Sequence, residues 1–174
     1  MAYIHNKYNI ILLLCIMSDI LKLVRNIKWT GDNVVRFTFP MLAGYVTQNI
    51  CWDKVSSKRA GERVAFRPPP NVFKIVWPLL YTLLGLSWIL SATGKKRNCM
   101  LEMSYISISV LLASWIFLYG CKNKKVLGVY AITLAIGFII LAMNLANVTS
   151  RVLLVPLLTW LILALLLNVF EVSM

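Results

Sequence analysis

Long, almost uninterrupted apolar runs dominate the pattern of hydrophobic and polar positions along the chain. Five of them approach the roughly 20 residues that a helix needs to cross a bilayer. Their apolar residues cover all sides of a helical projection, which is typical of helices in lipid, and the runs are too long for ordinary strands. The pattern therefore predicts an all-α integral membrane protein with five transmembrane helices, at Val34–Trp52, Asn71–Ser91, Met100–Gly120, Val126–Asn147 and Val152–Phe170.

Short, basic connections separate the second to fifth runs, so neighbouring helices are expected to be antiparallel and adjacent. The one long connection, Asp53–Pro70, is rich in Lys and Arg and ends in Pro68-Pro69-Pro70. These prolines form a stiff segment that is expected to be non-helical and to set the entry of the second helix. Lys and Arg are shared evenly between the two sides of a five-span arrangement, nine on each, so the positive-inside rule predicts no orientation.

A sixth apolar run, Tyr8–Val24, precedes these five and contains Asp19. It fits a membrane-lying helix, an additional span or a targeting element, and the sequence does not separate these three interpretations. We therefore divide the chain into two parts. Residues 1–33 are an N-terminal extension with an apolar segment at 8–24, and residues 34–174 are a five-helix transmembrane domain.

The overall composition agrees with a membrane protein. Sixty per cent of the residues are hydrophobic and the mean hydropathy is +0.77. Such an excess excludes a disordered chain, and 174 residues cannot hide that much apolar surface from water in a soluble globule. The formal net charge of +12 is also found in nucleic-acid-binding proteins, but here the basic residues lie in clusters between the apolar runs. No nucleic-acid partner is therefore expected.

The cysteines and the histidine do not indicate a catalytic or metal site. Cys15, Cys51, Cys99 and Cys121 lack C-x-x-C spacing, so neither a zinc site nor a redox pair is expected. We interpret these cysteines as small buried hydrophobic residues. His5 is the single histidine and lies near the terminus, so we expect no histidine-based triad, no two-histidine metal site and no haem ligand in the core.

The second run carries an aromatic stripe. Trp77, Tyr81, Gly85 and Trp88 fall within about 80° of one another on a helical projection. Gly85 would leave a notch between aromatic plates, which suits a flat apolar ligand such as a sterol or a porphyrin. The alternative is packing between helices together with an interfacial aromatic belt. From spacing alone, packing is the favoured interpretation.

Two other runs carry polar or small residues in meaningful positions. Trp160, Ala164 and Asn168 share one strip of the last run, where Ala164 permits close helix approach and Asn168 needs a partner or a wet cavity. Asn168 therefore either forms an interhelical hydrogen bond or faces a pocket. In the first run, Pro40 and Gly44 are expected to kink the helix and permit close backbone contact.

Two gapped motifs then make a family resemblance specific. The run Phe66–Tyr81, followed by Gly85, resembles the pattern aromatic-x-Pro-Pro-x-x-Val-Phe-x-x-Val-Trp-x-x-Leu-Tyr-x-x-x-Gly of the translocator protein family. This family is also called the tryptophan-rich sensory proteins or peripheral benzodiazepine receptors. The run Pro156–Asn168 resembles its last-helix pattern Pro-x-Leu-x-Trp-Leu-x-x-Ala-x-x-Leu-Asn, and Pro40 and Gly44 fit its first helix. The resemblance spans about residues 34–170.

The resemblance implies a five-helix bundle whose ligand pocket opens toward the long connection. Family members bind cholesterol or porphyrins and synthetic drugs. Animal members lie in the outer mitochondrial membrane, which is the expected location here if the source is an animal-type eukaryote, and bacterial members lie in the cell envelope. The resemblance places the following residues at the ligand: Pro40, Gly44, Trp77, Tyr81, Gly85, Trp88, Trp115, Trp160, Ala164 and Asn168. Arg67 either pairs with a porphyrin propionate or is a solvated loop charge.

Departures from the family pattern change the expected ligand. The third helix keeps Trp115 and Gly120 but lacks the family's Asn and Pro. The animal cholesterol motif needs Tyr and then Lys or Arg after the last helix, and residues 167–171 have neither. A tetrapyrrole or lipid is therefore favoured over cholesterol.

We expect a multi-pass membrane receptor or carrier for a flat apolar ligand, a tetrapyrrole, sterol or drug-like molecule, without a permanent cofactor. The alternative is a structural or interaction protein whose aromatic stripes serve helix packing and oligomer contacts. An enzyme is not expected, because the runs lack paired carboxylates and His5 is terminal. Membrane lipid is an expected partner, and a homodimer is left open.

Overall fold

The computed structural model describes residues 18, 22, 24–51, 64, 66–92 and 98–173. Five helices make up this part of the chain, and no strand occurs in it. They are α2 (Gly31–Ile50), α4 (Pro70–Ala92), α5 (Cys99–Trp115), α6 (Lys125–Leu145) and α7 (Val148–Ser173). A π-helical segment, η1 (Ile116–Cys121), continues α5. The predicted all-α, five-helix architecture is confirmed, and the interpretation of Tyr8–Val24 lies almost entirely outside the described residues.

Four of the helices are long and apolar enough to cross a membrane. The spans are Val72–Ala92, Cys99–Cys121, Lys125–Leu145 and Val148–Val172. The remaining helix, α2, includes Asp32 and Arg36 and corresponds to the run with the weakest apolar signal. The chain is therefore an integral membrane protein, and its outward-facing apolar side chains are exposed to lipid rather than to water.

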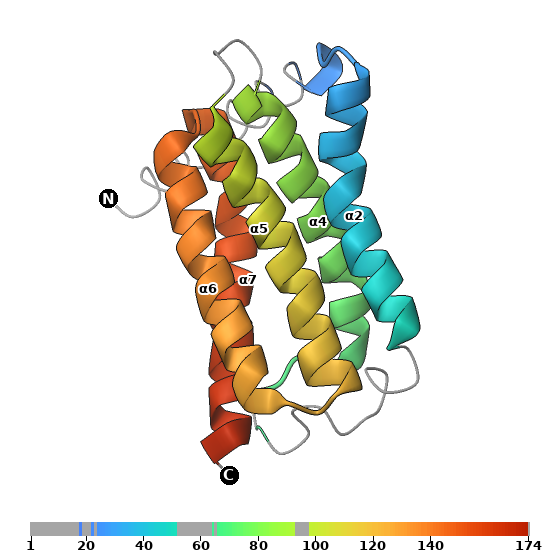
Figure 1. The fold of residues 1–174 in the computed structure, drawn as a ribbon, viewed down its shortest axis with the longest axis vertical. Helices are drawn as coiled ribbons and strands as arrows, with labels where there is room; N and C mark the ends of the chain where they lie inside the picture. Colours follow the sequence, from blue (N-terminus) through green and yellow to red (C-terminus); the bar gives the residue numbers. More distant parts are fainter. Residues whose placement is uncertain are drawn as a thin grey trace, which may run out of the picture.

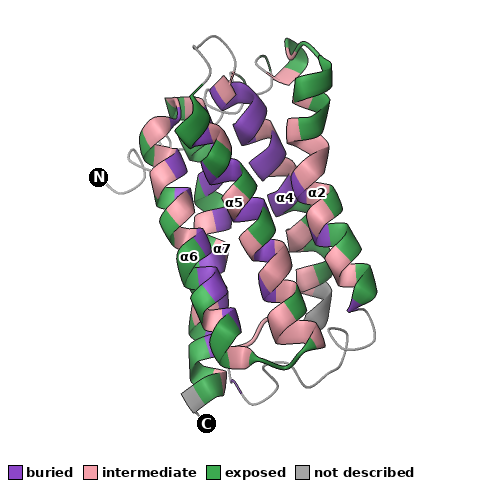
Figure 2. Ribbon diagram, viewed as in Figure 1, coloured by how far each residue is buried: buried purple, intermediate pink, exposed green. Residues whose placement is uncertain are grey.

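Successive helices run in opposite directions along one long axis (Figure 1). The helices α2, α5 and α7 begin at the end drawn uppermost, and α4 and α6 begin at the opposite end. We call these the upper and lower ends of the bundle. Each helix packs most closely against two neighbours, which gives the closed order α2, α4, α7, α6, α5 and back to α2, and α4 also contacts α5. Buried and exposed residues alternate along most of the helices, whereas the upper end of α4 is buried on all sides (Figure 2).

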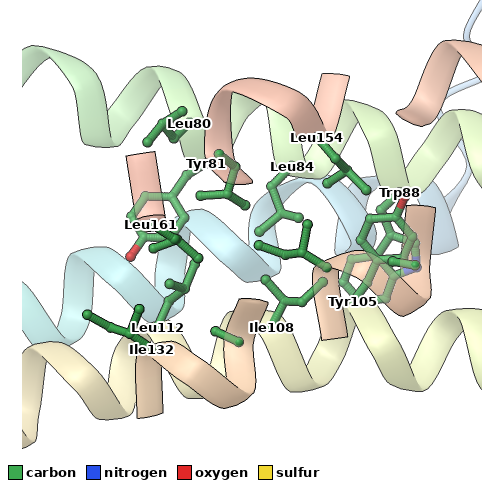
Figure 3. Close-up of a cluster of buried hydrophobic side chains, with 14 of the residues drawn as sticks. Leu80, Tyr81, Leu84, Trp88, Tyr105, Ile108, Leu112, Ile132, Leu154 and Leu161 are labelled. Atoms are coloured by element: carbon green, nitrogen blue, oxygen red, sulfur yellow. The ribbon is translucent and has the colours of Figure 1, made fainter. Parts of the chain in front are cut away.

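Aliphatic side chains from four helices fill the middle of the ring. Leu84 of α4, Ile108 and Leu112 of α5, and Leu154 and Leu161 of α7 are all fully buried, and Ile132 of α6 joins them (Figure 3). The interior is thus a packed core at this level. Any ligand site must lie toward one of the two ends or at a seam between helices.

Side-chain capping explains where several helices begin. Asn98 accepts hydrogen bonds from the backbone N–H groups of Met100 and Leu101, at 3.1 and 3.3 Å, and so caps α5. Asn147 caps α7 by accepting from the N–H of Ser150 at 2.9 Å. Pro70 is the first residue of α4, where a proline needs no helical N–H. The expectation that the whole proline run is non-helical therefore holds for its first two residues and is wrong for Pro70.

A disulfide joins Cys51, at the end of α2, to Cys121, at the end of η1. Our interpretation of these two cysteines as unpaired small hydrophobic residues is therefore wrong. The two lie 70 residues apart, so no local spacing could indicate the bond. Cys99, at the upper end, is exposed and free, so its interpretation as a buried residue is also wrong, and Cys15 lies outside the described residues.

Candidate functional site: an aromatic cluster between three helices

Trp77 of α4 is the centre of a group of four rings. Its ring centroid lies 5.4 Å from that of Trp115 on α5 and 5.6 Å from that of Tyr81 on its own helix. The ring of Trp160 on α7 approaches Trp77 edge-on at 6.5 Å. We call Trp77, Tyr81, Trp115 and Trp160 the aromatic cluster. Four of the residues predicted from three separate runs are thus brought together.

Two more rings extend the aromatic cluster toward the lower end. Phe73, one turn before Trp77, packs against Trp160 with centroids 5.4 Å apart. Tyr119 of η1 stacks on Trp115 at 5.9 Å and an interplanar angle of 22°. Neither residue was among the ligand residues predicted from the sequence. Phe73 belongs to the motif that carries the family resemblance and could have been chosen on that ground, whereas Tyr119 depends on the π-helical backbone of η1.

The aromatic cluster contains two buried polar atoms without a hydrogen-bond partner. They are the hydroxyl oxygen of Tyr81 and the indole Nε1 of Trp160. Burying a polar group without a partner is costly, and most buried polar groups in proteins are paired. Among the described residues, Ser150 Oγ is the one further buried side-chain atom of this kind, and it lies at the upper end. The cluster therefore combines flat apolar surfaces with unused hydrogen-bonding capacity.

Glycines bring α2 and α4 into close contact beside the cluster. A Cβ atom on Gly44 would lie 2.5 Å from the ring of Tyr81. A Cβ atom on Gly85 would lie 2.8 Å from the backbone oxygen of Phe37. The close approach at Gly44 is to the ring of Tyr81 rather than to the backbone that the sequence predicted, and Pro40 is buried one turn earlier. The space beside Gly85 holds the α2 backbone, so Gly85 serves helix packing and lies apart from the aromatic cluster.

Asn168 lies next to the aromatic cluster through Trp115. The indole Nε1 of Trp115 donates to Asn168 Oδ1 at 3.4 Å, and Asn168 Nδ2 donates to the backbone oxygen of Ala164 at 2.6 Å. Both Asn168 and Ala164 are buried. Of the two alternatives for Asn168, this geometry is that of an interhelical hydrogen bond between α7 and α5.

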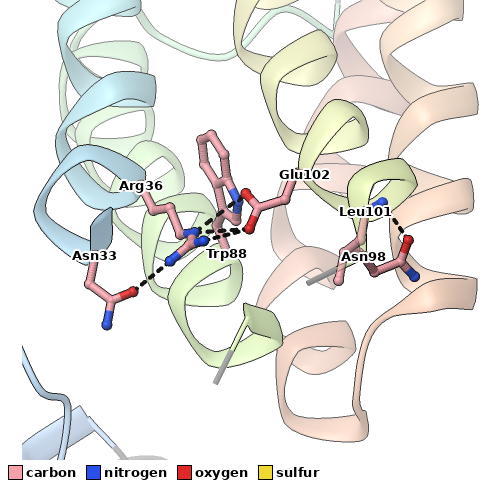
Figure 4. A network of polar contacts seen from close by, with 6 residues as sticks. All are labelled: Asn33, Arg36, Trp88, Asn98, Leu101 and Glu102. Carbon is pink, nitrogen blue, oxygen red and sulfur yellow. Dashed lines mark hydrogen bonds and ion pairs between the residues drawn. The ribbon is translucent and has the colours of Figure 1, made fainter. Parts of the chain in front are cut away.

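Trp88 lies apart from the aromatic cluster, in a polar network at the upper end (Figure 4). Its Nε1 donates to Glu102 Oε2 at 2.6 Å. Arg36 of α2 donates to Glu102 Oε1 through Nη2 at 2.6 Å and through Nε at 3.1 Å, and to Asn33 through Nη1 at 2.9 Å. The network connects α2, α4 and α5. The sequence contained a signal for this ion pair, because a basic and an acidic residue, Arg36 and Glu102, lie inside two different apolar runs.

Hydroxyl groups continue this polar region. The ring of Trp88 stacks on Tyr105 at 5.5 Å and 5°. The Tyr105 hydroxyl lies 2.7 Å from Ser87 Oγ and 2.8 Å from Ser91 Oγ, and Ser87 also donates to the backbone oxygen of Ser150 at 2.9 Å. These contacts join α4, α5 and α7. The upper end is thus held by polar contacts, in contrast to the aromatic cluster below.

Charged side chains surround the lower end. Glu171 of α7 accepts from the Tyr119 hydroxyl and from Lys125 Nζ, the latter at 2.8 Å. Arg67 is half-buried in the connection that leads into α4, and the neighbouring Phe66 packs on Phe170 of α7 with centroids 5.4 Å apart. A cavity of about 480 Å³ opens at this end, lined by Asn123, Lys124, Lys125, Val126, Leu127, Glu171 and Val172. None of its lining residues belongs to the aromatic cluster.

The site offers no metal-binding group within the described ranges. No set of three or more His, Cys, Asp or Glu residues there is placed to hold a metal ion. The chemistry available at the cluster is stacking on flat rings and hydrogen bonding to Tyr81 and Trp160.

Comparison with known proteins identifies the family. The sequence model of the TspO/MBR family matches residues 36–172, which is most of the chain. This range includes all four residues of the aromatic cluster. A search of curated proteins found no match.

Proposed function

The chain belongs to the TspO/MBR family, and we propose that it is a receptor or carrier for a flat apolar ligand bound at the aromatic cluster. The ligand class we propose is a tetrapyrrole or a sterol, with the tetrapyrrole favoured. Binding would occur without a chemical reaction. If the source is an animal-type eukaryote, the outer mitochondrial membrane is the location we propose.

The observation that carries this proposal is the pair of unpartnered polar atoms in an aromatic cluster. Trp160 Nε1 can donate a hydrogen bond, and the Tyr81 hydroxyl can donate or accept one. A flat ligand with an oxygen or nitrogen acceptor would satisfy Trp160 while its plane stacks on Trp77 or Trp115. Hydrogen bonds from the ligand to these two buried groups would add to the stabilisation that stacking provides.

Arg67 supports the choice of a tetrapyrrole. It lies in the connection at the lower end, where Phe66 packs against the last helix. A guanidinium binds a carboxylate strongly through paired hydrogen bonds, so Arg67 could hold a propionate of a porphyrin whose ring reaches the aromatic cluster. A sterol carries one hydroxyl and no acid, and it would not depend on Arg67.

A structural or interaction protein remains the second candidate, because some predicted ligand residues are used in helix packing. Gly85 lies against the backbone of α2, and the Asn168 amide is bonded to Trp115 and Ala164. In this alternative the aromatic cluster would fasten α4, α5 and α7 to one another. Saturable ligand binding separates the two candidates.

The test is a titration of the purified chain in detergent with protoporphyrin and, separately, with cholesterol. Trp160→Phe keeps an aromatic ring but removes the indole N–H, and we expect it to weaken porphyrin binding by about 1 kcal/mol, roughly fivefold. Trp29→Phe is the matched control, because Trp29 is exposed and outside the cluster. Non-saturable binding of both ligands, or equal affinity in the two variants and the wild type, would contradict the proposal.

A further inference from the structure

We propose that the Cys51–Cys121 disulfide is a redox-sensitive clasp that closes the seam between α2 and the end of α5 and thereby slows ligand exchange at the aromatic cluster. This inference rests on the proposed function. Cys51 follows the last residue of α2, and Cys121 is the last residue of η1. Their Cα atoms are 5.1 Å apart. The bond therefore ties the lower end of α2 to the lower end of α5.

Within the part of the chain that the structure describes, the lower half of α2 contacts η1 but is less deeply buried than the upper half. Its buried residues are Pro40 and Gly44, and no residue of α2 after Gly44 is buried. The side chains of Thr47 and Asn49 donate to carbonyls of α2 itself, at 2.8 and 3.0 Å. Ile50 is 68% exposed, whereas the adjoining Cys51 is 1% exposed. Within α2, full burial thus ends at Gly44, and the turns beyond it are held by contacts with η1 and by the disulfide at Cys51.

The upper half of α2 is anchored in a different way. Arg36 is bonded to Glu102 on α5, and Gly85 on α4 lies against Phe37. Between the two halves lie Pro40 and Gly44, the residue types at which helices bend. Breaking the disulfide would free residues 45–51 to move about this point while the upper half stays in place.

On the α5 side, the disulfide lies two residues from a ring that packs on the aromatic cluster. Cys121 ends η1, in which the backbone N–H of Lys122 donates to the oxygen of Phe117 five residues earlier, at 3.1 Å. Single π-helical turns are rare and frequently occur at functional sites. Tyr119, two residues before Cys121, stacks on Trp115. Fixing Cys121 therefore fixes the segment that holds Tyr119 over the cluster.

Opening the clasp is a two-electron reduction by a thiol reductant. A thiolate attacks one sulfur, with Cys121 the more accessible of the two residues because it is only half-buried. The S–S bond breaks, a mixed disulfide forms, and a second reductant thiol displaces the protein sulfur. Cys51 and Cys121 gain two electrons and two protons as thiols, and the reductant becomes a disulfide. The clasp would stay closed where the lower end faces an oxidising compartment and open where thiol reductants reach it.

The experiment compares oxidised and reduced forms of the full chain in detergent. Cys15→Ser/Cys99→Ser serves as the background, so that Cys51 and Cys121 are the two cysteines left in the chain. Protoporphyrin dissociation is followed by stopped flow, with and without dithiothreitol, and thiol labelling confirms the redox state. We expect reduction to raise the dissociation rate by about fivefold or more, within the usual range of coupling between two sites. The Cys51→Ser/Cys121→Ser variant should dissociate fast and not respond to dithiothreitol.

The outcomes separate the clasp from the function on which it rests. Saturable porphyrin binding with the same dissociation rate in both redox states would overturn the clasp and leave the proposed function standing. Absence of saturable binding in both states would overturn the proposed function and the clasp's role in ligand exchange with it. Because the comparison is made by reducing a folded protein, it does not depend on whether the serine variant folds.

Discussion

Arg36 of α2 and Glu102 of α5 form an ion pair across 66 residues of sequence, with Nη2 2.6 Å from Oε1. The side chains are 12% and 21% exposed. A charge in such a place is costly when its partner is removed. The pair therefore fastens the upper end of α2 to the bundle, opposite the end that the disulfide holds.

Replacing one member of this pair leaves the other charge unpaired, so the two single substitutions together should cost more stability than the double substitution. Glu102→Gln keeps an acceptor for Trp88 but leaves Arg36 without its counter-charge. We expect a loss of about 1–3 kcal/mol, allowing for partial exposure. Arg36→Met combined with Glu102→Gln should cost less than the sum of the two single changes. Thermal unfolding in detergent measures all three variants, and strict additivity would contradict the coupling.

Substitutions at Trp77 and Trp88 should have different effects, because Trp77 lies in the aromatic cluster and Trp88 in the polar network at the upper end. Trp77→Ala takes away the centre of the aromatic cluster, and we expect porphyrin affinity to fall by about 1–3 kcal/mol. Trp88→Phe keeps a ring on Tyr105 and loses the N–H that binds Glu102. It should lower the melting temperature and leave porphyrin affinity within about twofold. A larger affinity loss in Trp88→Phe than in Trp77→Ala would place the ligand at the upper end instead.

Adding a methyl group at two glycines should have opposite consequences. A Cβ on Gly85 would meet the backbone of Phe37 at 2.8 Å, and backbone atoms cannot move aside as a flexible side chain can. Gly85→Ala should therefore force α2 and α4 apart and cost about 1–3 kcal/mol. A Cβ on Gly137 would meet nothing within 4 Å, so Gly137→Ala should be neutral or stabilise the helix by up to about 1 kcal/mol.

Both variants are measured by thermal unfolding in the same detergent. The comparison isolates steric contact, since the two changes are chemically identical and both lie within helices. Equal melting temperatures for Gly85→Ala and Gly137→Ala would show that α2 does not pack on Gly85 in solution.

The sequence predicts the helices well because each apolar run by itself has the length and composition of a span. With η1 counted as the end of the third span, the predicted ends differ from the observed ones by at most about four residues, as at Val148, where α7 begins before the predicted Val152. The aromatic cluster was partly predictable for a similar reason. Helical spacing places Trp77 and Tyr81 on one face of α4, and the family resemblance adds Trp115 and Trp160 from other helices.

The sequence could not predict which helix packs against each face of a given helix. Spacing shows that Gly85 and Trp88 share a stripe with Trp77, but it does not show that α2 covers Gly85 or that Glu102 lies against Trp88. These contacts depend on how the helices are arranged around the ring. The disulfide between Cys51 and Cys121 is missed for the same reason, because it joins the ends of two helices that are not consecutive.

Asn168 provides the last test, because its two hydrogen bonds decide between packing and ligand binding. Asn168→Leu fills the same space with an apolar side chain but removes the acceptor of Trp115 Nε1 and the donor to the Ala164 carbonyl. Hydrogen bonds between membrane helices contribute about 0.6 kcal/mol on average, and a buried indole N–H left without a partner adds to the loss. We expect the free energy of unfolding to fall by about 1 kcal/mol and porphyrin affinity to change little.

Asn144→Leu is the matched control, since Asn144 is exposed near the end of α6 and the substitution is chemically the same. Its melting temperature should stay close to that of the wild type. Melting temperature and porphyrin affinity are measured on the same preparation, so a loss of folded protein cannot be mistaken for weaker binding. If Asn168→Leu kept the wild-type melting temperature and lost affinity, the Asn168 amide would have to turn toward the ligand. In that case Trp115 Nε1, released from Asn168, would become a further hydrogen-bond donor inside the aromatic cluster.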